Sequence, residues 1–398
     1  MMVGLRRVPL VTGGAGLWCR RMRCAPCLLV LLLSVPAAPW LAALDANANV
    51  NPSADEAEGD TKFFRDMMAD AAAYRVGLVS ATAAQQDNES ARRYLREAKE
   101  LLASGHEIRA RWRAEDGFDE HPYSALAGDL LRTAMEGYAV GRKLSGVHES
   151  LLKLWLFIPN WQGMDEAMRR AIEVAEREQD FSAAINLEAD DPAKVIAIDG
   201  TTLMADSGTN RLFRFLAQHG DRAGVAPRAA LGLARSQLIH GGRDQIFEAR
   251  AAYERFIGEY PANPQYTFPA VCEYALSYLV TYRGANYDMG VLVMAATLID
   301  QAEIETMGAP DRVATVQAYR KRIRLWMQDR DLAVARWYRD RGTPPVLAWL
   351  RMPAGLRSWS DGAHTFYDSV VARDPASNQA RDAERERSAL PPKSSTVR

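Results

Sequence analysis

The sequence has few cysteines, and most of them lie near its start. Of the four cysteines, Cys19, Cys24 and Cys27 precede residue 28, and Cys272 stands alone in the rest of the chain. One cysteine cannot close a disulfide within its own chain. A small scaffold held together by disulfides is therefore excluded for everything after the N-terminal stretch.

The chain also lacks an excess of either charge. It carries 49 Lys and Arg residues against 50 Asp and Glu residues, which gives a formal net charge of -1. A near-neutral chain has no bulk attraction for nucleic acid or anionic lipid, so a charged partner must be recognised by a local patch. We expect no nucleic-acid partner.

Groupings typical of catalytic or metal sites are also missing. No two of the six histidines stand at the i, i+4 spacing that places two imidazoles on one helical face. The glycine-rich stretch VTGGAG at 11–16 lacks the strand, helix and acidic residue that a dinucleotide site needs. We therefore expect no catalytic residues, no cofactor, no metal and no enzymatic activity.

The N-terminal stretch has the layout of a secretory signal. Basic residues up to Arg23 precede the apolar run CLLVLLLSVPAAPWLAAL, which leads into small residues at 43–48. Pro36 and Pro39 interrupt the run, which makes it unsuited to a membrane-spanning helix of about 20 residues. We predict a signal peptide over 1–48 and export to the periplasm or the outer-membrane periphery, with an uncleaved anchor as the alternative.

The remaining sequence is dominated by helical periodicity. Apolar residues recur at steps of three and four, and strand-like alternation is nearly absent. The segments with this pattern are 63–79, 91–103, 124–140, 164–177, 227–239, 247–260, 267–282, 288–304 and 312–341. The predicted fold class is all-α, an array of helical hairpins.

A repeated pattern indicates how these hairpins stack. The spacing A-x3-Y-x7-P occurs at Ala249, Tyr253 and Pro261, and again at 363–375. A third copy keeps Ala110 and Pro122 but has an alanine, Ala114, in the aromatic position. A small residue lets helices approach closely, an aromatic residue fills the next gap and proline ends the helix. This predicts a tetratricopeptide-like α-solenoid, with a plain helical bundle as the alternative.

The composition divides the chain into six parts. They are a signal peptide at 1–48, a flexible leader at 49–62, N-terminal helical repeats at 63–180, an insertion loop at 181–208, C-terminal helical repeats at 209–376 and a disordered tail at 377–398.

Parts of the sequence resemble the BamD-like tetratricopeptide proteins of the cell envelope. The resemblance covers 89–140 and 209–376, and it includes ARAAYERFIGEYPANPQY from Ala249 and the Tyr338, Arg341, Gly342 trio before the last repeat. It implies an exported scaffold that binds a protein or an extended peptide, with components of outer-membrane protein assembly as partners. The chain departs from the family in lacking a lipid-bearing cysteine after the apolar run, so membrane association would be peripheral.

Two segments are candidates for contact with a partner. The helix predicted at 312–341 is rich in Arg and aromatic residues, which pair with carboxylates and stack on rings. Its candidate partner-binding residues are Arg320, Arg322, Arg324, Trp326 and Arg341. The alternative is an aromatic core beside a solvated basic face. The run LLKLWLFIPNW at 151–161 is the second candidate, and we favour its burial between repeats.

The acidic insertion 181–208 supports an alternative function. Its carboxylates are Glu188, Asp190, Asp191, Asp199 and Asp206, which offer oxygen ligands to a hard cation. Their spacing matches no loop that would make them converge, so a solvated loop is favoured. The alternative to the scaffold is thus an enzyme with its site in this insertion, held on a helical frame.

Overall fold

The structure is a computed structural model that describes residues 54–179, 181, 185–196, 207–240, 243–261, 263–304, 309–341 and 359–393. Contacts divide the chain after Ala57, so almost all described residues belong to the second unit, Glu58–Arg398. The predicted signal at 1–48 lies outside the described residues.

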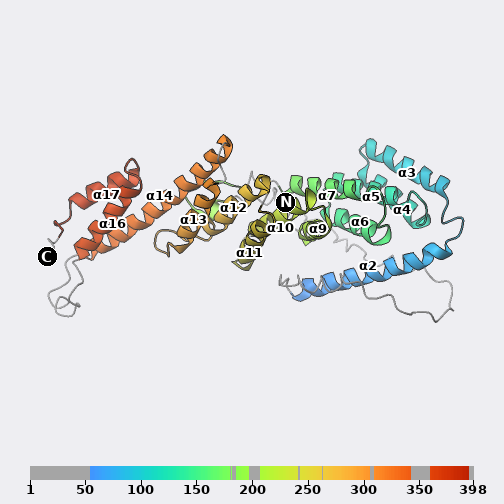
Figure 1. Ribbon diagram of the computed structural model, residues 1–398, viewed down its shortest axis with the longest axis horizontal. Helices are drawn as coiled ribbons and strands as arrows, with labels where there is room; N and C mark the ends of the chain where they lie inside the picture. The colour runs from blue at the N-terminus through green and yellow to red at the C-terminus, as the bar shows by residue number, and fades with distance from the viewer. Residues whose placement is uncertain are drawn as a thin grey trace, which may run out of the picture. The chain divides into compact units, whose positions relative to one another are not determined.

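Fourteen α-helices account for most of the described chain (Figure 1). They are α2 (Ala54–Ser80), α3 (Asn88–Ala103), α4 (Glu107–Glu120), α5 (Ala127–Val140), α6 (Leu144–Phe157), α7 (Met164–Glu178), α9 (Ser207–His219), α10 (Val225–His240), α11 (Arg243–Glu259), α12 (Pro264–Leu279), α13 (Gly290–Ile304), α14 (Pro310–Asp340), α16 (Trp359–Arg373) and α17 (Asn378–Ser388). Extended pairing in the described ranges is limited to one isolated bridge, Ile185 to Ile196.

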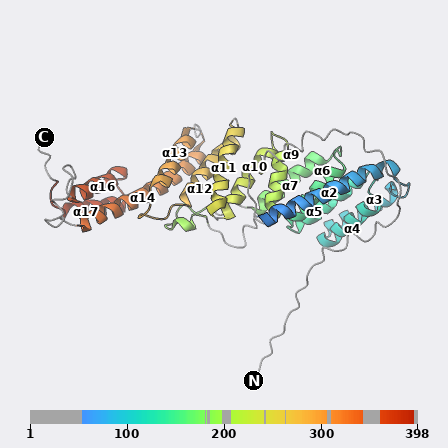
Figure 2. The same cartoon turned by 90° about the horizontal axis from the view of Figure 1, so that it is seen from below.

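Helices that are near in sequence pack against one another, as two perpendicular views show (Figures 1 and 2). α4 lies against both α3 and α5, α11 against both α10 and α12, and α16 against both α14 and α17. A second set of contacts joins alternate helices: α3 with α5, α5 with α7, α7 with α10, α10 with α12, and α14 with α17. The protein is thus an all-helical, solenoid-like array, which confirms the predicted fold class.

Two helices carry the hydrophobic core from one part of the array to the next. α10 contributes Val225 and Ala229 to the core of the preceding helices, and Leu231 and Leu238 to the core that follows. α14 does the same further along, because its first half packs into that second core while Leu332 enters a third. At α10 and α14, the apolar side of one hairpin is therefore shielded by the next.

Local sequence explains where several helices begin and turn. The Asp87 side chain accepts hydrogen bonds from the backbone N–H groups of Glu89 and Ser90, which caps α3. The turn from α3 to α4 contains Gly105 at a φ of 77°, in the left-handed region that suits glycine. Pro310 stands in the first turn of α14, where a missing N–H costs nothing.

The alanines of the repeated pattern occupy equivalent helix contacts. Ala110, Ala249 and Ala363 are each 0% exposed. They lie on α4, α11 and α16, each of which packs between the preceding and the following helix. Tyr253 and Tyr367, one turn later, are also 0% exposed. These positions fit the packing role that the sequence pattern predicted for them.

Arg–Glu ion pairs connect alternate helices at four junctions of the array. We call this set the Arg–Glu ladder. It consists of Arg132–Glu166 at 2.5 Å and Arg170–Glu136 at 3.0 Å between α5 and α7, Arg228–Glu176 at 2.5 Å between α7 and α10, Arg235–Glu273 at 2.6 Å between α10 and α12, and Arg336–Glu386 at 2.6 Å between α14 and α17. Each pair fixes the lateral register of two helices that also meet through apolar side chains.

The described structure corrects two predicted boundaries. The tail at 377–398 is not disordered over its first part, because Asn378–Ser388 form α17, capped by the Ser377 side chain. Helix α2 begins at Ala54, inside the predicted flexible leader. α17 is strongly polar and contributes only Ala380 and Ala383 to the buried set, so its periodic signal is weak.

The first part of the apolar run at 151–161 is buried, as favoured, whereas Pro159 and Asn160 at its end are exposed. Leu151, Leu152, Leu154 and Leu156 of α6 are at most 5% exposed and belong to the first core. Within the described ranges, no helix is both long enough and apolar enough to cross a membrane.

Enlarging one pattern alanine should destabilise the array. We expect Ala249→Leu to lower the free energy of unfolding by about 1–3 kcal/mol, because the added side chain has no space between α10 and α12. The matched control is Ala251→Leu on the exposed side of the same helix, where a change within about 0.5 kcal/mol is expected. Equal unfolding midpoints for the two variants in urea would contradict the packing role.

Candidate partner-binding surface

The five residues predicted to bind a partner lie in three different environments on α14 and at its end. Arg320, Arg322 and Arg324 follow one another on the helix, Trp326 comes half a turn later and Arg341 caps its C-terminus. Because successive residues point in different directions around a helix, burial and pairing differ at each position.

Arg320 is engaged by the neighbouring helix. Its Nη2 lies 2.5 Å from the Asp300 Oδ1 and 2.7 Å from the Glu303 Oε2, both on α13. The hydrogen bonds that Arg320 donates to Glu303 and Asp300 raise the pKa of its guanidinium. Arg320 therefore ties α13 to α14, and its side chain remains 27% exposed at the edge of a cleft.

Arg322 and Trp326 are core residues, which corrects their prediction as surface contacts. The Arg322 side chain is 9% exposed and its Nε donates to the Leu187 carbonyl, while its Nη1 lies 3.5 Å from the Asp190 carboxylate. Trp326 is 3% exposed. Its ring stacks on that of Tyr282, with centroids 5.4 Å apart. Neither side chain is available to a partner without local opening.

Arg324 is exposed and faces a polar cleft of about 600 Å³, which we call the α14 cleft. One wall is α14 itself. The other is the turn between α16 and α17. The lining residues are Glu303, Gln317, Arg320, Lys321, Arg324, Leu325, Asp374, Ala376, Ser377, Asn378 and Gln379. Of the predicted residues, this cleft brings together only Arg320 and Arg324.

Arg341 belongs to a separate aromatic group at the far end of α14. Its guanidinium carbon lies 3.9 Å from the centroid of the Trp337 ring and 5.7 Å from that of Trp359 on α16. Trp337 is 46% exposed, so this cation–π contact is open to solvent. The group holds the end of α14 against the start of α16, and it is distinct from the α14 cleft.

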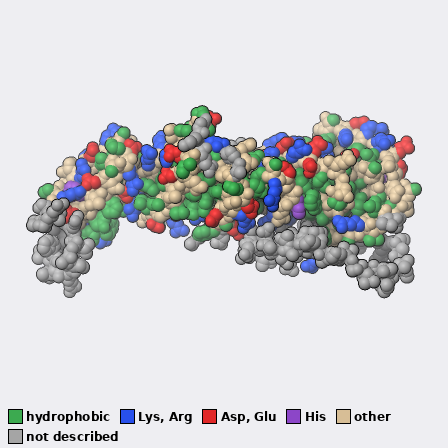
Figure 3. Space-filling model, in the orientation of Figure 1, with side chains coloured by type: hydrophobic (Ala, Val, Ile, Leu, Met, Phe, Trp, Pro, Cys, Tyr) green, Lys and Arg blue, Asp and Glu red, His purple; other side chains and the backbone are tan. Residues whose placement is uncertain are grey.

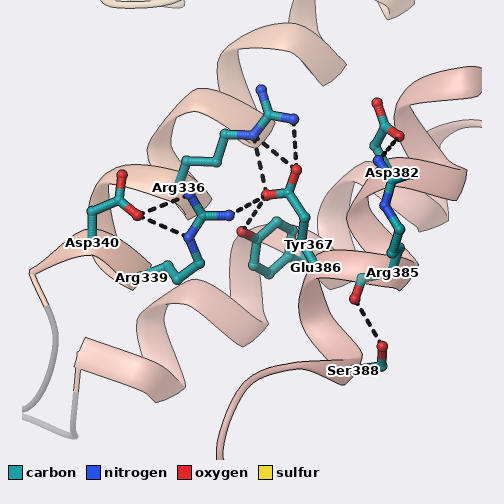
Figure 4. A network of polar contacts seen from close by, with 8 residues as sticks. All are labelled: Arg336, Arg339, Asp340, Tyr367, Asp382, Arg385, Glu386 and Ser388. Carbon is teal, nitrogen blue, oxygen red and sulfur yellow. Dashed lines mark hydrogen bonds and ion pairs between the residues drawn. The ribbon is translucent and has the colours of Figure 1, made fainter.

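The polar centre of the last hairpin is Glu386 on α17, shown in Figure 4. Its carboxylate accepts from Arg336 at 2.6 Å, Arg339 at 2.7 Å and the Tyr367 hydroxyl at 2.9 Å. Arg336 on α14 is the largest cause that lowers the pKa of Glu386. Three helices therefore meet at one carboxylate.

The same arrangement occurs earlier in the array, on α10, α11 and α12. Glu273 on α12 accepts from Arg235 on α10 at 2.6 Å and from the Tyr253 hydroxyl at 3.2 Å. The glutamate follows its tyrosine by 20 residues here and by 19 residues in the last hairpin. Sequence reasoning missed this Arg–Tyr–Glu triad, although the similar tyrosine-to-glutamate spacing, 20 and 19 residues, was a usable signal.

The first copy replaces the triad with alanines. Ala98, Ala114 and Ala134 form a small buried cluster on α3, α4 and α5. Ala114 holds the place of Tyr253, four residues after the pattern alanine. In this copy the tyrosine, the arginine and the glutamate of the triad are thus all absent, and three alanines pack together instead.

Carboxylates in the described part of the insertion do not converge on a cation. Asp191 caps the short 3₁₀ helix Pro192–Lys194 by accepting from the Ala193 N–H at 3.0 Å, and Asp190 faces Arg322. Val195 is 0% exposed and packs in the second core. Among the residues the structure describes, no group of acidic, histidine and cysteine side chains could hold a metal ion. Asp199 and Asp206 lie outside those residues.

Charges elsewhere are mixed. On the face drawn in Figure 3, basic and acidic side chains are interspersed over the described helices. A local grouping such as the α14 cleft therefore matters more than any field of the whole molecule. Comparisons with known protein families and with curated proteins found no match for this chain.

The stability contributed by Glu386 should depend on pH. Because the pKa of Glu386 is lowered in the folded state, its stabilisation is complete above the unfolded value of about 4.3 and is lost as the pH falls through the folded value. We expect Glu386→Gln to cost about 1–2 kcal/mol at neutral pH and nearly nothing in strong acid.

Urea unfolding at a series of pH values measures this difference. The matched control is Glu384→Gln, an exposed glutamate on the same helix, which should stay within about 0.5 kcal/mol of the wild type throughout. A cost for Glu386→Gln that stays constant as the pH falls would contradict the assignment of the network.

Proposed function

We propose that this chain is an exported, non-enzymatic, tetratricopeptide-like scaffold of the cell envelope that binds a protein or an extended peptide. Outer-membrane protein assembly is the setting implied by its BamD-like stretches. Peripheral contact with the membrane fits this setting.

The stacked arrangement of the helices is the observation that carries the proposal. Helices that hide their apolar sides against their neighbours leave long polar surfaces, on which extended segments of other proteins commonly bind. The α14 cleft is one such polar surface, and Trp337 adds an exposed aromatic contact elsewhere on α14. An envelope location is supported by the signal-like sequence at 1–48.

The alternative of an enzyme with its site in the insertion has less support. The described carboxylates Asp190 and Asp191 are used in an ion pair and a helix cap. Apolar residues of the same segment, Val195 and Ile196, are buried in the second core. The described part of the insertion therefore has a structural role.

Cell fractionation followed by N-terminal sequencing tests the location. We expect the chain in the periplasmic or membrane-peripheral fraction, with a new N-terminus near the small residues at 43–48. The matched control is Leu32→Arg, which places a charge in the apolar run and should retain the precursor in the cytoplasm. An intact, cytoplasmic wild-type chain would refute export.

Crosslinking of the tagged, exported chain in intact cells tests the scaffold role. We expect a small set of envelope proteins to be captured repeatedly, because a scaffold holds defined partners. The Leu32→Arg variant again serves as the control for contacts made in the wrong compartment. Capture of no envelope protein above that control would contradict the proposed function.

A further inference from the structure

We propose that the α14 cleft binds an extended acidic segment of a partner protein, through Lys321 and Arg324. This inference rests on the scaffold function proposed above and names the chemistry of its partner. Of the five residues that the sequence predicted to contact a partner, this proposal keeps Arg324. It adds Lys321, which the sequence analysis did not select.

Three polar side chains that line this cleft, two of them cationic, form a stripe on one side of α14. Gln317, Lys321 and Arg324 stand at i, i+4 and i+7, a spacing that brings side chains onto a common face. All three are exposed. In the described part of the chain neither Lys321 nor Arg324 has an ion-pair partner, whereas the adjacent Arg320 is held by Asp300 and Glu303.

The acidic residues that line the cleft are already engaged. Glu303 is paired with Arg320. The Asp374 Oδ1 accepts from the Ala376 N–H at 3.1 Å, which shapes the turn into α17. The lining cations, Arg320, Lys321 and Arg324, outnumber the two lining carboxylates, and this excess of positive charge complements carboxylates of a partner.

The opposite wall suits a peptide backbone. It is the turn from Asp374 to Gln379, which presents small and amide side chains rather than an apolar surface. The stripe from Gln317 to Arg324 spans about 10 Å along the helix, the length of about three residues of an extended chain. The two cations, Lys321 and Arg324, stand about 4.5 Å apart along the helix axis. Acidic residues at alternate positions of an extended segment lie on one face about 7 Å apart, which the long side chains of Lys321 and Arg324 can span.

Charge placement favours a peptide over a phosphate polymer. A polyphosphate or nucleic acid carries a negative charge on every unit, and some units would face Glu303 and Asp374. A peptide avoids this repulsion, because it can place neutral residues beside those carboxylates and acidic ones beside Lys321 and Arg324.

A second cleft provides an internal control. It has a volume of about 630 Å³ and also lies beside a turn with a pattern proline, Pro261. Among the described residues that line it, Arg222 is the one cation, and Glu259 lines it as well. With no second cation, this cleft does not offer the paired contacts of the α14 cleft.

Fluorescence anisotropy with a defined probe tests the proposal. The probe is a labelled peptide of about eight residues in which Glu and Gly alternate, with both ends capped, and the matched probe has Gln in place of Glu. We expect the full chain to bind the Glu peptide, to bind it more weakly as salt rises from about 50 to 200 mM, and to bind the Gln peptide at least tenfold more weakly.

The decisive variant is the double charge reversal Lys321→Glu with Arg324→Glu. It should weaken binding of the Glu peptide about tenfold or more, because two attractive contacts become repulsive. Arg222→Glu should bind as the wild type does. Because Lys321, Arg324 and Arg222 are all exposed, the thermal melting temperatures of these variants should equal that of the wild type. If the double charge reversal does not fold, the double variant Lys321→Gln with Arg324→Gln takes its place.

Equal affinity of the double variant and the wild type would overturn the proposal, as would equal loss in Arg222→Glu. Tighter binding of inorganic polyphosphate than of the Glu peptide would overturn the choice of a peptide. If the double variant captured partners at the wild-type level, the scaffold function would be supported and the cleft would be excluded as the binding site. If the peptide bound through Lys321 and Arg324 but no partner were captured in cells, the cleft would be supported and the scaffold function contradicted.

Discussion

Close approach of helices at small residues is the constraint on which this structure depends. Ala110, Ala249 and Ala363 are each fully buried where one helix is enclosed by two others. Backbones that meet so closely leave room for an aromatic ring one turn later, and Tyr253 and Tyr367 fill that room. The Arg–Glu ladder then fixes how neighbouring helices align. Partly exposed ion pairs add little to the free energy of unfolding. We therefore infer that they set the alignment of the helices more than they stabilise the fold.

The use of arginines in ion pairs between helices decides which charged side chains are available to a partner. Many arginines of the described helices hold helices together, among them those of the Arg–Glu ladder. Arg322 anchors the insertion through the Leu187 carbonyl. Lys321 and Arg324 differ, because they point from α14 into a polar cleft rather than across to another helix. A scaffold of this kind binds its partner through charged side chains that are not used in contacts between its own helices.

The sequence predicted those features that local spacing controls. The pattern alanines, the tyrosines one turn later and most helices were readable from steps of three, four and seven residues. Contacts between distant residues were not readable. Arg322 meets Leu187 across 135 positions, and nothing near Arg322 indicates that partner. For Trp326 the sequence left a partner contact and an aromatic core as alternatives, because aromatic residues serve cores and interfaces equally well. Helix α17 was missed because only two alanines of its polar sequence are buried.

Hydrogen exchange of a locally strained variant tests the central claim most directly. Ala363→Leu overfills the contact between α14, α16 and α17. In an array whose parts are stabilised by their neighbours, we expect amide protection to fall in these three helices and to remain at wild-type level in α3 to α5. A uniform loss of protection along the chain would contradict the account, because it would show one cooperative globule instead of stacked hairpins.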